Sequence, residues 1–173
     1  MILTGQQIIL ERSLQRITIE PFDVEKITTN SFDLLLGDEL IEYIDEILDP
    51  KKKNEVRRVQ FDENGEYFLK KGSFVLGHSN EIVGSNHYVP IIHARSSVAR
   101  LGLFVHVTAD LIDIGSIGQV TFQLFATQSV VLKRGMKIGQ VSFWVPHGEI
   151  SLYRGKYHNS IGPQASLSHL DKS

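Results

Sequence analysis

Short apolar runs separated by turn residues dominate the chain after Pro21. Glycine, proline, asparagine and aspartate punctuate the sequence between runs that are rich in β-branched and aromatic residues. This spacing is typical of an all-β sandwich, jelly roll or barrel. The predicted strands cover residues 40–47, 57–61, 67–69, 73–76, 88–92, 103–107, 119–125, 130–132 and 138–145. Because no long amphipathic segment interrupts them, a parallel sheet covered by helices is not expected.

One helix is predicted, close to the start of the chain. Thr4 is a favourable N-cap residue, and Gln7 stands three residues later, where a capping box places its second member. Leu3 and Ile8 flank the cap in the positions of a hydrophobic staple. The apolar positions that follow predict a helix over residues 4–14.

The composition fits one globular domain. The 173 residues are 42% apolar and 22% charged, which is too apolar for a disordered chain and enough for a sizeable core. We expect residues 1–173 to form one domain, with a Gly-, Asn- and Ser-rich tail from about residue 154 closing over the functional site. The net charge of −2 argues against binding nucleic acid through global charge. With no secretory signal and no membrane-length apolar run, we expect a cytoplasmic protein without membrane partners.

The absence of cysteine removes several kinds of chemistry. Disulfides, thiolate zinc sites and cysteine nucleophiles all require this residue. Seven histidines are present, but no His-x-x-x-His pair and no His-Glu-x-x-His motif occurs among them. We therefore expect no metal held by the protein's own side chains, and no zinc.

The stretch from residue 95 to 103 is the most informative for binding. Arg95, Ser96, Ser97 and Arg100 lie within six residues, beside a glycine. Arginine binds phosphate with two parallel hydrogen bonds, and serine hydroxyls donate to phosphate oxygens. Taken alone, the same pattern also fits a short helical turn with two solvated arginines.

The stretch from residue 106 to 119 is the second candidate. Its aspartate, Asp113, is followed by Gly115 and Gly118, which predicts a strand, a tight hairpin and a second strand. Asp113 would then stand at a strand end, held by a rigid scaffold. An ordinary turn aspartate is the alternative.

Six segments in this order resemble the dCTP deaminase branch of the dCTP deaminase/dUTPase superfamily. They are the Met-Ile-Leu start with the opening helix, Ser-Phe-Asp-Leu-Leu-Leu-Gly at 31–37, residues 95–103, residues 106–118, Lys-Arg-Gly-Met-Lys-Ile-Gly-Gln at 133–140, and residues 153–157 with the Gly-Pro at 162–163. The resemblance implies a distorted jelly roll or β-barrel of the dUTPase-like type with a short N-terminal helix. It also implies a homotrimer whose sites, between subunits, bind a pyrimidine deoxynucleoside triphosphate.

The same resemblance implies roles for individual residues. Asp113 matches an aspartate that orients water for attack on the α-phosphorus. Magnesium would be carried by the triphosphate, as expected of a hard cation. The segment that binds the triphosphate and organises the catalytic centre would comprise Arg95, Ser96, Ser97 and Arg100. The strand that contacts the pyrimidine edge would comprise Val107, Thr108 and Ala109. The tail residues that close over the phosphates would be Tyr153 and Lys156.

Three positions depart from the family pattern. Gln123 stands where the deaminases have a glutamate that exchanges protons with water and the ring. Glutamine can bind the base but cannot exchange a proton, and losing a general acid–base group costs about 10²–10⁴-fold in rate. Ser116 replaces an aromatic residue near the deoxyribose, which would weaken steric exclusion of a 2′-hydroxyl. Ser160 takes the place of a glutamine that contacts the nucleotide.

Three hypotheses follow for the function. The first is the family reaction, in which dCTP and water give dUTP and ammonia. A deaminase without cysteine would have to activate water without zinc, using Arg100, Ser96 and the backbone of Ala109 to position water and base. The second is a dUTP diphosphatase that uses Asp113. The third is a nucleotide-binding protein without turnover.

Overall fold

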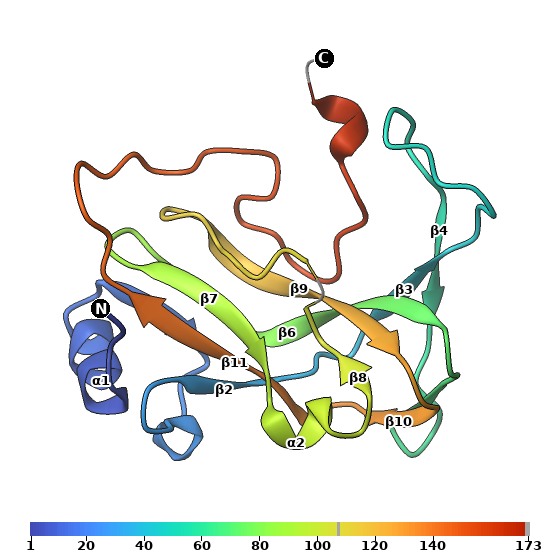
Figure 1. Ribbon diagram of the computed structural model, residues 1–173, viewed down its shortest axis with the longest axis horizontal. Coiled ribbons are helices and arrows are strands. Elements are labelled where there is room, and N and C mark those ends of the chain that lie inside the picture. Colours follow the sequence, from blue (N-terminus) through green and yellow to red (C-terminus); the bar gives the residue numbers. More distant parts are fainter. Residues whose placement is uncertain (107, 172–173) are drawn as a thin grey trace.

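The computed structural model describes residues 1–106 and 108–171, and it is built mainly of β-strands (Figure 1). The strands are β1 (Ile17–Glu20), β2 (Phe32–Leu35), β3 (Leu40–Tyr43), β4 (Val56–Val59), β5 (Glu66–Leu69), β6 (Phe74–Ser85), β7 (Val89–Ala94), β8 (Leu103–Phe104), β9 (Ile117–Ala126), β10 (Val130–Lys133) and β11 (Lys137–Trp144). The helical elements are α1 (Gly5–Ser13), α2 (Ser96–Ala99) and two 3₁₀ turns, η1 (Val24–Lys26) and η2 (Ser168–Leu170). Within the described ranges, no helix is long and apolar enough to span a membrane.

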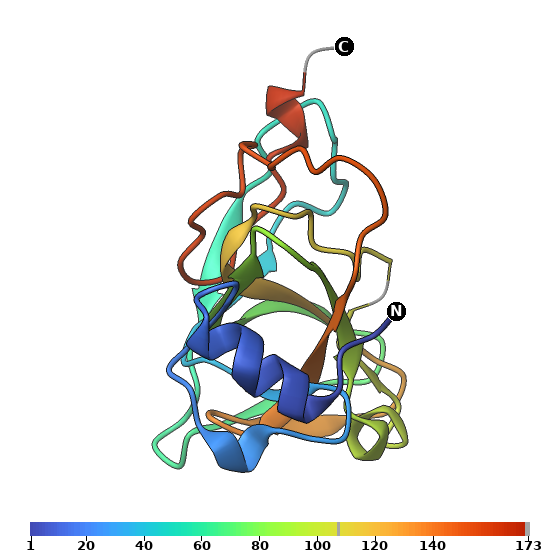
Figure 2. The ribbon, with the colours of Figure 1, turned by 90° about the vertical axis from the view of Figure 1, so that its left-hand side faces the viewer.

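Antiparallel pairing joins the strands into three sheets. The largest has the order β4-β3-β6-β9-β8, with β1 paired to one end of β6. A second has the order β2-β11-β7, and β5 pairs with β10 in a third. The sheets curve around one apolar core, as Figure 2 shows with α1 lying in front of them. The predicted mainly β jelly-roll class with a short N-terminal helix is confirmed.

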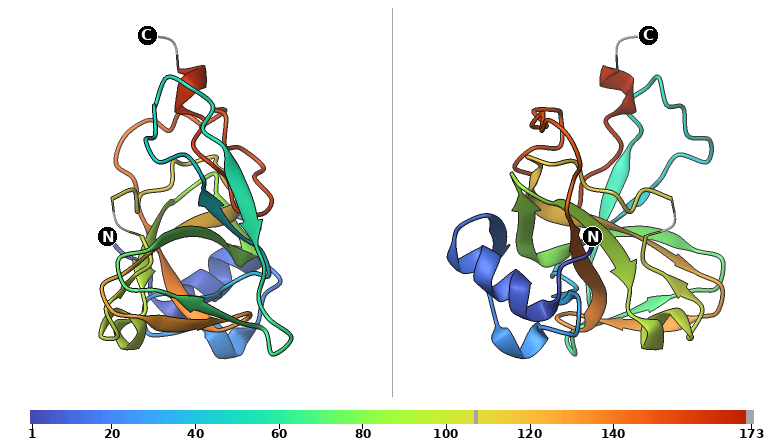
Figure 3. Two further views of the ribbon diagram at one scale, coloured as in Figure 1. Left: turned by 90° about the vertical axis from the view of Figure 1, so that its right-hand side faces the viewer. Right: turned by 60° about the vertical axis from the view of Figure 1, so that its left-hand side comes forward.

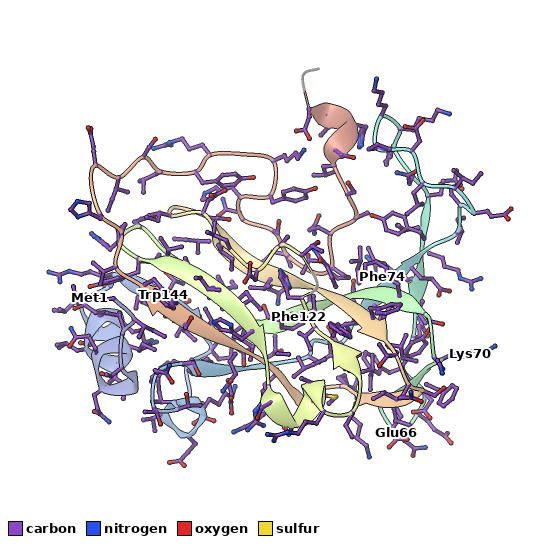
Figure 4. The ribbon with its side chains drawn as sticks, in the orientation of Figure 1. Met1, Glu66, Lys70, Phe74, Phe122 and Trp144 are labelled. Carbon is purple, nitrogen blue, oxygen red and sulfur yellow. The ribbon has the colours of Figure 1, made fainter. Side chains whose placement is uncertain are left out.

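Alternation along β9 decides which of its side chains face the core. Val120, Phe122 and Leu124 are buried, whereas Thr121 and Gln123 are only partly covered. Successive side chains of a strand point to opposite faces, so Gln123 lies on the outer face. Figure 4 shows Phe122 between the sheets, where its side chain is fully buried.

The N-terminal helix forms close to the predicted residues. Thr4 caps it, and its side chain accepts a hydrogen bond from the backbone of Gln7 at 3.4 Å. The expected capping box is wrong, because the side chain of Gln7 donates to Glu11 at 2.8 Å instead of bonding back to Thr4.

The strand limits were predicted less well than the strands themselves. The segments that form β1 and β2 were not predicted as strands, and the strand predicted over 103–107 ends at Phe104. The strand predicted over 73–76 continues to Ser85, across residues for which no strand was predicted. Its buried Glu81 is paired with Lys26 at 2.8 Å and accepts a hydrogen bond from the backbone of Leu35 at 3.0 Å, which allows β6 to continue.

Candidate functional site

A cavity of about 460 Å³ lies between the outer face of β9 and the C-terminal tail. The strand and the segment before it contribute Ala109, Ser116 and Gln123. The tail contributes Tyr157 and Ser160 from the other side. Four candidate residues from the sequence, Ala109, Ser116, Gln123 and Ser160, therefore meet in one cavity. The remaining lining residues are Tyr43, Phe74, Leu76, Val83, His106, Ile112, Gly118, Gln119, Val120, Thr121, Gln164, Ala165 and Ser166.

Hydrogen bonds along β9 hold the tail over this cavity. The backbone of Gln119 donates to Ser160 O at 2.8 Å, and Asn159 N donates to Ile117 O at 3.0 Å. The side chain of Gln119 accepts from Gly162 N at 2.6 Å. The tail then passes beside the β3–β4 hairpin, as both views in Figure 3 show.

Tyrosine hydroxyls fix the last part of the tail. Tyr43 of β3 accepts a hydrogen bond from Ser166 N at 2.8 Å, and Tyr157 accepts one from Leu167 N at 2.8 Å. The Ser168 hydroxyl donates to a backbone carbonyl of the β3–β4 loop at 2.7 Å. The wall of the cavity that the tail supplies is therefore anchored on two strands.

Two glycines give the tail room to approach. A Cβ on Gly118 would lie 2.8 Å from Ser160 N and 2.9 Å from Ser160 O. Gly115 has a φ of +94°, and a Cβ there would lie 2.8 Å from Tyr153 N. Both positions require glycine because backbone from the tail packs against them.

The predicted hairpin around these glycines is wrong. The segment before them pairs with β7, because Ile92 N donates to Asp110 O at 2.8 Å and Ile112 N donates to Pro90 O at 2.9 Å. Asp113 therefore stands in an exposed loop and not at the end of a regular strand. No hydrogen bond or ion pair of its side chain occurs among the described residues.

Gln123 lines a cavity in which none of the described lining residues carries a carboxylate. Its backbone N–H donates to Val105 O at 3.0 Å, which fixes the strand beside the start of the 105–116 segment. Among the described residues that line the cavity, the titratable side chains are those of Tyr43, His106 and Tyr157. The cavity thus holds no acid–base group of the kind the sequence resemblance calls for at position 123.

Among the described residues that line this cavity, His106 supplies the imidazole. Burial lowers its pKa, and this outweighs the backbone of Ala109 and Val105 and the charge of Asp110, which act in the opposite direction. Its Nδ1 is buried and has no hydrogen-bond partner in the described part of the chain. The lowered pKa favours the neutral form of the ring.

The arginine and serine segment lies elsewhere on the chain. Ser96, Ser97 and Arg100 are exposed on or next to α2, and none of them lines the cavity. Figure 1 shows α2 at the end of the molecule opposite the tail. Arg95 is paired with Asp33, with 3.3 Å between Nε and Oδ1. One chain alone does not bring this segment to Gln123.

Asp113 and the tail residues Tyr153 and Lys156 do not line the cavity. Asp113 and Tyr153 line a separate hollow of about 470 Å³, which shares Ile112 with the cavity. Lys156 is paired with Asp171 of the tail at 2.5 Å. Ala109, one of the residues expected to contact the base, lines the cavity, whereas Thr108 is exposed and does not line it. Val107 lies outside the described residues.

Sequence reasoning missed several lining residues. Gln119 and Thr121 share the outer face of β9 with Gln123, and a period of two along that strand could have identified them. Tyr43 and Gln164 reach the cavity through tertiary packing, for which the sequence carries no local signal. No group of three His, Asp or Glu side chains within the described ranges is placed to hold a metal ion.

Comparison with solved structures defines the fold. The chain resembles the crystal structure of 2′-deoxycytidine 5′-triphosphate deaminase from Agrobacterium tumefaciens, with a TM-score of 0.66. The match covers 84% of this chain and 48% of that one at 20% sequence identity. At this identity the likeness concerns the fold alone.

Comparison of sequences defines the family. Residues 2–145 match the family described as dCTP deaminase-like. The "dCTP deaminase, dUMP-forming" of Clostridium beijerinckii is 42% identical over 172 residues, covering 99% of this chain and 98% of that protein. A protein of the same name from Leptospira biflexa is 39% identical over the same shares of each chain. The chain belongs to the dCTP deaminase-like family, which confirms the resemblance inferred from the motifs.

Proposed function

We propose that this protein hydrolyses pyrimidine deoxynucleoside triphosphates at the α-phosphorus and leaves the amino group of cytosine largely in place. The relatives from C. beijerinckii and L. biflexa are named for forming dUMP from dCTP. That product lacks both the ring amino group and two phosphates, so its formation combines two separate hydrolyses. In this chain, the amide of Gln123 on the cavity wall is the observation that disfavours loss of the amino group while leaving phosphate hydrolysis possible.

The ring reaction needs a group that exchanges protons. Water must lose a proton to attack the ring, and the leaving amine must gain one. Gln123 can donate and accept hydrogen bonds, but it can neither take the proton from water nor give one to the leaving amine. No carboxylate replaces it among the described residues of the cavity. Deamination is therefore expected to run about 10²–10⁴-fold below that of a chain with glutamate at this position.

The phosphate reaction needs a different group, and this chain retains it. Asp113 is an exposed carboxylate beside the cavity. It would take a proton from water as the water oxygen bonds to the α-phosphorus. The bond from that phosphorus to the bridging oxygen then breaks, and pyrophosphate leaves with its electron pair. Nucleoside monophosphate is the second product.

Positive side chains would hold the phosphates. Arg95, Arg100 and Lys156 supply charge, and the hydroxyls of Ser96 and Ser97 supply donors. We expect a magnesium ion to accompany the triphosphate, bound through phosphate oxygens and water, because a hard cation prefers oxygen ligands. The ion would neutralise charge on the triphosphate.

We include in this proposal a homotrimer with its sites between subunits. The arginine and serine segment does not line the cavity of its own chain, so a second copy would supply it. Apolar side chains next to that segment support a contact surface, because Leu101 and Phe104 are 57% and 49% exposed. Sedimentation should give a mass about three times the 19.5 kDa of one chain. A monomer would refute the shared site.

Ser116 lines the cavity where the family resemblance implies an aromatic residue near the deoxyribose, and its small side chain would leave space beside the sugar. We therefore expect weak discrimination between deoxyribose and ribose. Rates measured with CTP and UTP beside dCTP and dUTP test this. A preference of more than about 100-fold for the deoxynucleotides would contradict it.

Two variants and two matched controls test whether Asp113 is needed for phosphate hydrolysis and whether Gln123 limits deamination. Pyrophosphate release and the ultraviolet spectrum of the ring are followed with dCTP and with dUTP in the presence of Mg²⁺. Asp113→Asn should abolish pyrophosphate release, and Gln123→Glu should raise deamination by about 10²-fold or more. Asp110→Asn and Gln128→Glu make the same chemical changes at exposed positions outside the cavity and should leave both rates unchanged.

The outcome separates the proposal from its alternatives. Efficient loss of the ring amino group by the unmodified protein would establish the deaminase and refute the role given to Gln123. Tight nucleotide binding with no product from either nucleotide would establish a binding protein without turnover. Pyrophosphate release that survives Asp113→Asn would refute the role given to that carboxylate.

A further inference from the structure

A buried carboxylate carrying two cations lies at the edge of the β2-β11-β7 sheet. Asp33 is 3% exposed. Its Oδ1 lies 3.3 Å from Arg95 Nε and accepts a hydrogen bond from Gln140 Nε2 at 3.0 Å. Its Oδ2 lies 3.2 Å from Lys137 Nζ. Two positive side chains thus share one negative charge, and the cluster carries a net charge of +1.

Strand register brings these residues together from distant parts of the sequence. Gln140 of β11 lies directly opposite Asp33 of β2. Lys137 is opposite Leu35 in the same pair of strands. Arg95 follows β7 on the other side of β11, and its backbone N–H donates to Ile138 O at 3.1 Å. The cluster is therefore held by the rigid part of the fold and not by a loop.

Arg95 and Lys137 retain hydrogen-bond donors that do not contact Asp33. Arg95 contacts the carboxylate through Nε, and neither of its terminal nitrogens bonds to another of the described residues. The side chains of Arg95 and Lys137 are 34% and 40% exposed, so both reach solvent from a buried anchor. Ser96 and Ser97 follow immediately with exposed hydroxyls. Fixed cations beside free hydroxyl donors match the chemistry of a phosphate chain.

We propose that Lys137 is a phosphate-binding residue, acting with Arg95 on the polyphosphate of the nucleotide. This inference rests on the proposed function, which supplies the triphosphate, and it adds a residue to which the motifs gave no role. Lys137 supplies a compact charge, and the Arg95 guanidinium supplies two parallel donors. Asp33 holds both side chains in place.

Binding of inorganic tripolyphosphate, measured by calorimetry on the full chain in Mg²⁺ buffer, tests this. Lys137→Gln should weaken binding by roughly tenfold, as expected for the loss of one charge-assisted hydrogen bond. Lys137→Arg should retain most of the affinity. Lys133→Gln is the matched control, because Lys133 ends β10 only four residues before Lys137 but pairs with Glu66 at 2.7 Å. That variant should bind as the unmodified protein does.

The probe separates this proposal from the proposed function. Tripolyphosphate has neither a base nor a nucleoside ester, so its binding reports on the anion site whether or not any nucleotide is turned over. Equal affinity in Lys137→Gln and the unmodified protein would overturn the role of Lys137, as would an equal loss in Lys133→Gln. Absence of tripolyphosphate binding by the unmodified protein would overturn it as well.

Discussion

Replacing Gly118 with alanine should detach the C-terminal tail from β9. The added Cβ would lie 2.8 Å from Ser160 N and 2.9 Å from Ser160 O. Both neighbours are backbone atoms, so no side chain can rotate away, and the tail itself must move. The three heavy atoms nearest the added Cβ all belong to the backbone of Asn159 and Ser160, and none of them belongs to a core side chain.

The magnitude follows from the contacts that the movement breaks. Two backbone hydrogen bonds flank the clash, from Gln119 N to Ser160 O at 2.8 Å and from Asn159 N to Ile117 O at 3.0 Å. Each contributes about 0.5–1.5 kcal/mol net. Their loss amounts to about 1–3 kcal/mol, which corresponds to roughly 5–150-fold in the equilibrium between attached and detached tail.

Native-state hydrogen exchange measures this opening residue by residue. The amide of Gln119 should exchange roughly 5–150-fold faster in Gly118→Ala. Gln123 lies on the same strand as Gln119, and its amide donates to Val105 O. This amide is an internal control, and its exchange rate should not change. Equal exchange of Gln119 in both proteins would refute the explanation given for Gly118. Faster exchange at both amides would show instead that the strand as a whole is destabilised.

Three further predictions concern the rest of the molecule. Phe122→Ala should lower the free energy of unfolding by about 3–5 kcal/mol, measured by urea denaturation, because Phe122 is fully buried between the sheets; a loss below 1 kcal/mol would contradict this. Lys26→Met leaves buried Glu81 without its partner and should cost about 3–5 kcal/mol, whereas unchanged stability would mean that the ion pair is dispensable. Because burial lowers the pKa of His106, its contribution to stability is present above the unfolded value of about 6.5 and is lost as pH falls toward the lowered native value. Replacing His106 with Gln should therefore reduce the loss of stability between pH 7.5 and 5, and an unchanged pH profile would argue against it.

The fold class could be predicted because it depends on local pattern. Short apolar runs and turn residues indicated an all-β fold, and Thr4 marked the start of the helix. Strand limits were harder, because β6 continues through Glu81 only with the help of Lys26, which comes from a distant segment. A polar residue inside a strand cannot be recognised when its partner is 55 positions away.

The candidate site could be predicted only in part, for a similar reason. The motif residues Gln123, Ser116 and Ala109 do meet in one cavity. The glycines at 115 and 118 indicated a hairpin, but they are required by the approach of the tail, which is far away in sequence. The cluster around Asp33 depends on the register of three strands, which no short motif reports.

The stoichiometry of products from dCTP tests the central claim most directly. Ammonia and pyrophosphate are quantified in the same reaction of the unmodified protein with dCTP and Mg²⁺. Conversion of dCTP to dUMP releases one ammonia for each pyrophosphate. With Gln123 in the cavity, we predict that pyrophosphate exceeds ammonia by about 100-fold or more. Equal amounts of the two products would contradict the account, as would ammonia without pyrophosphate.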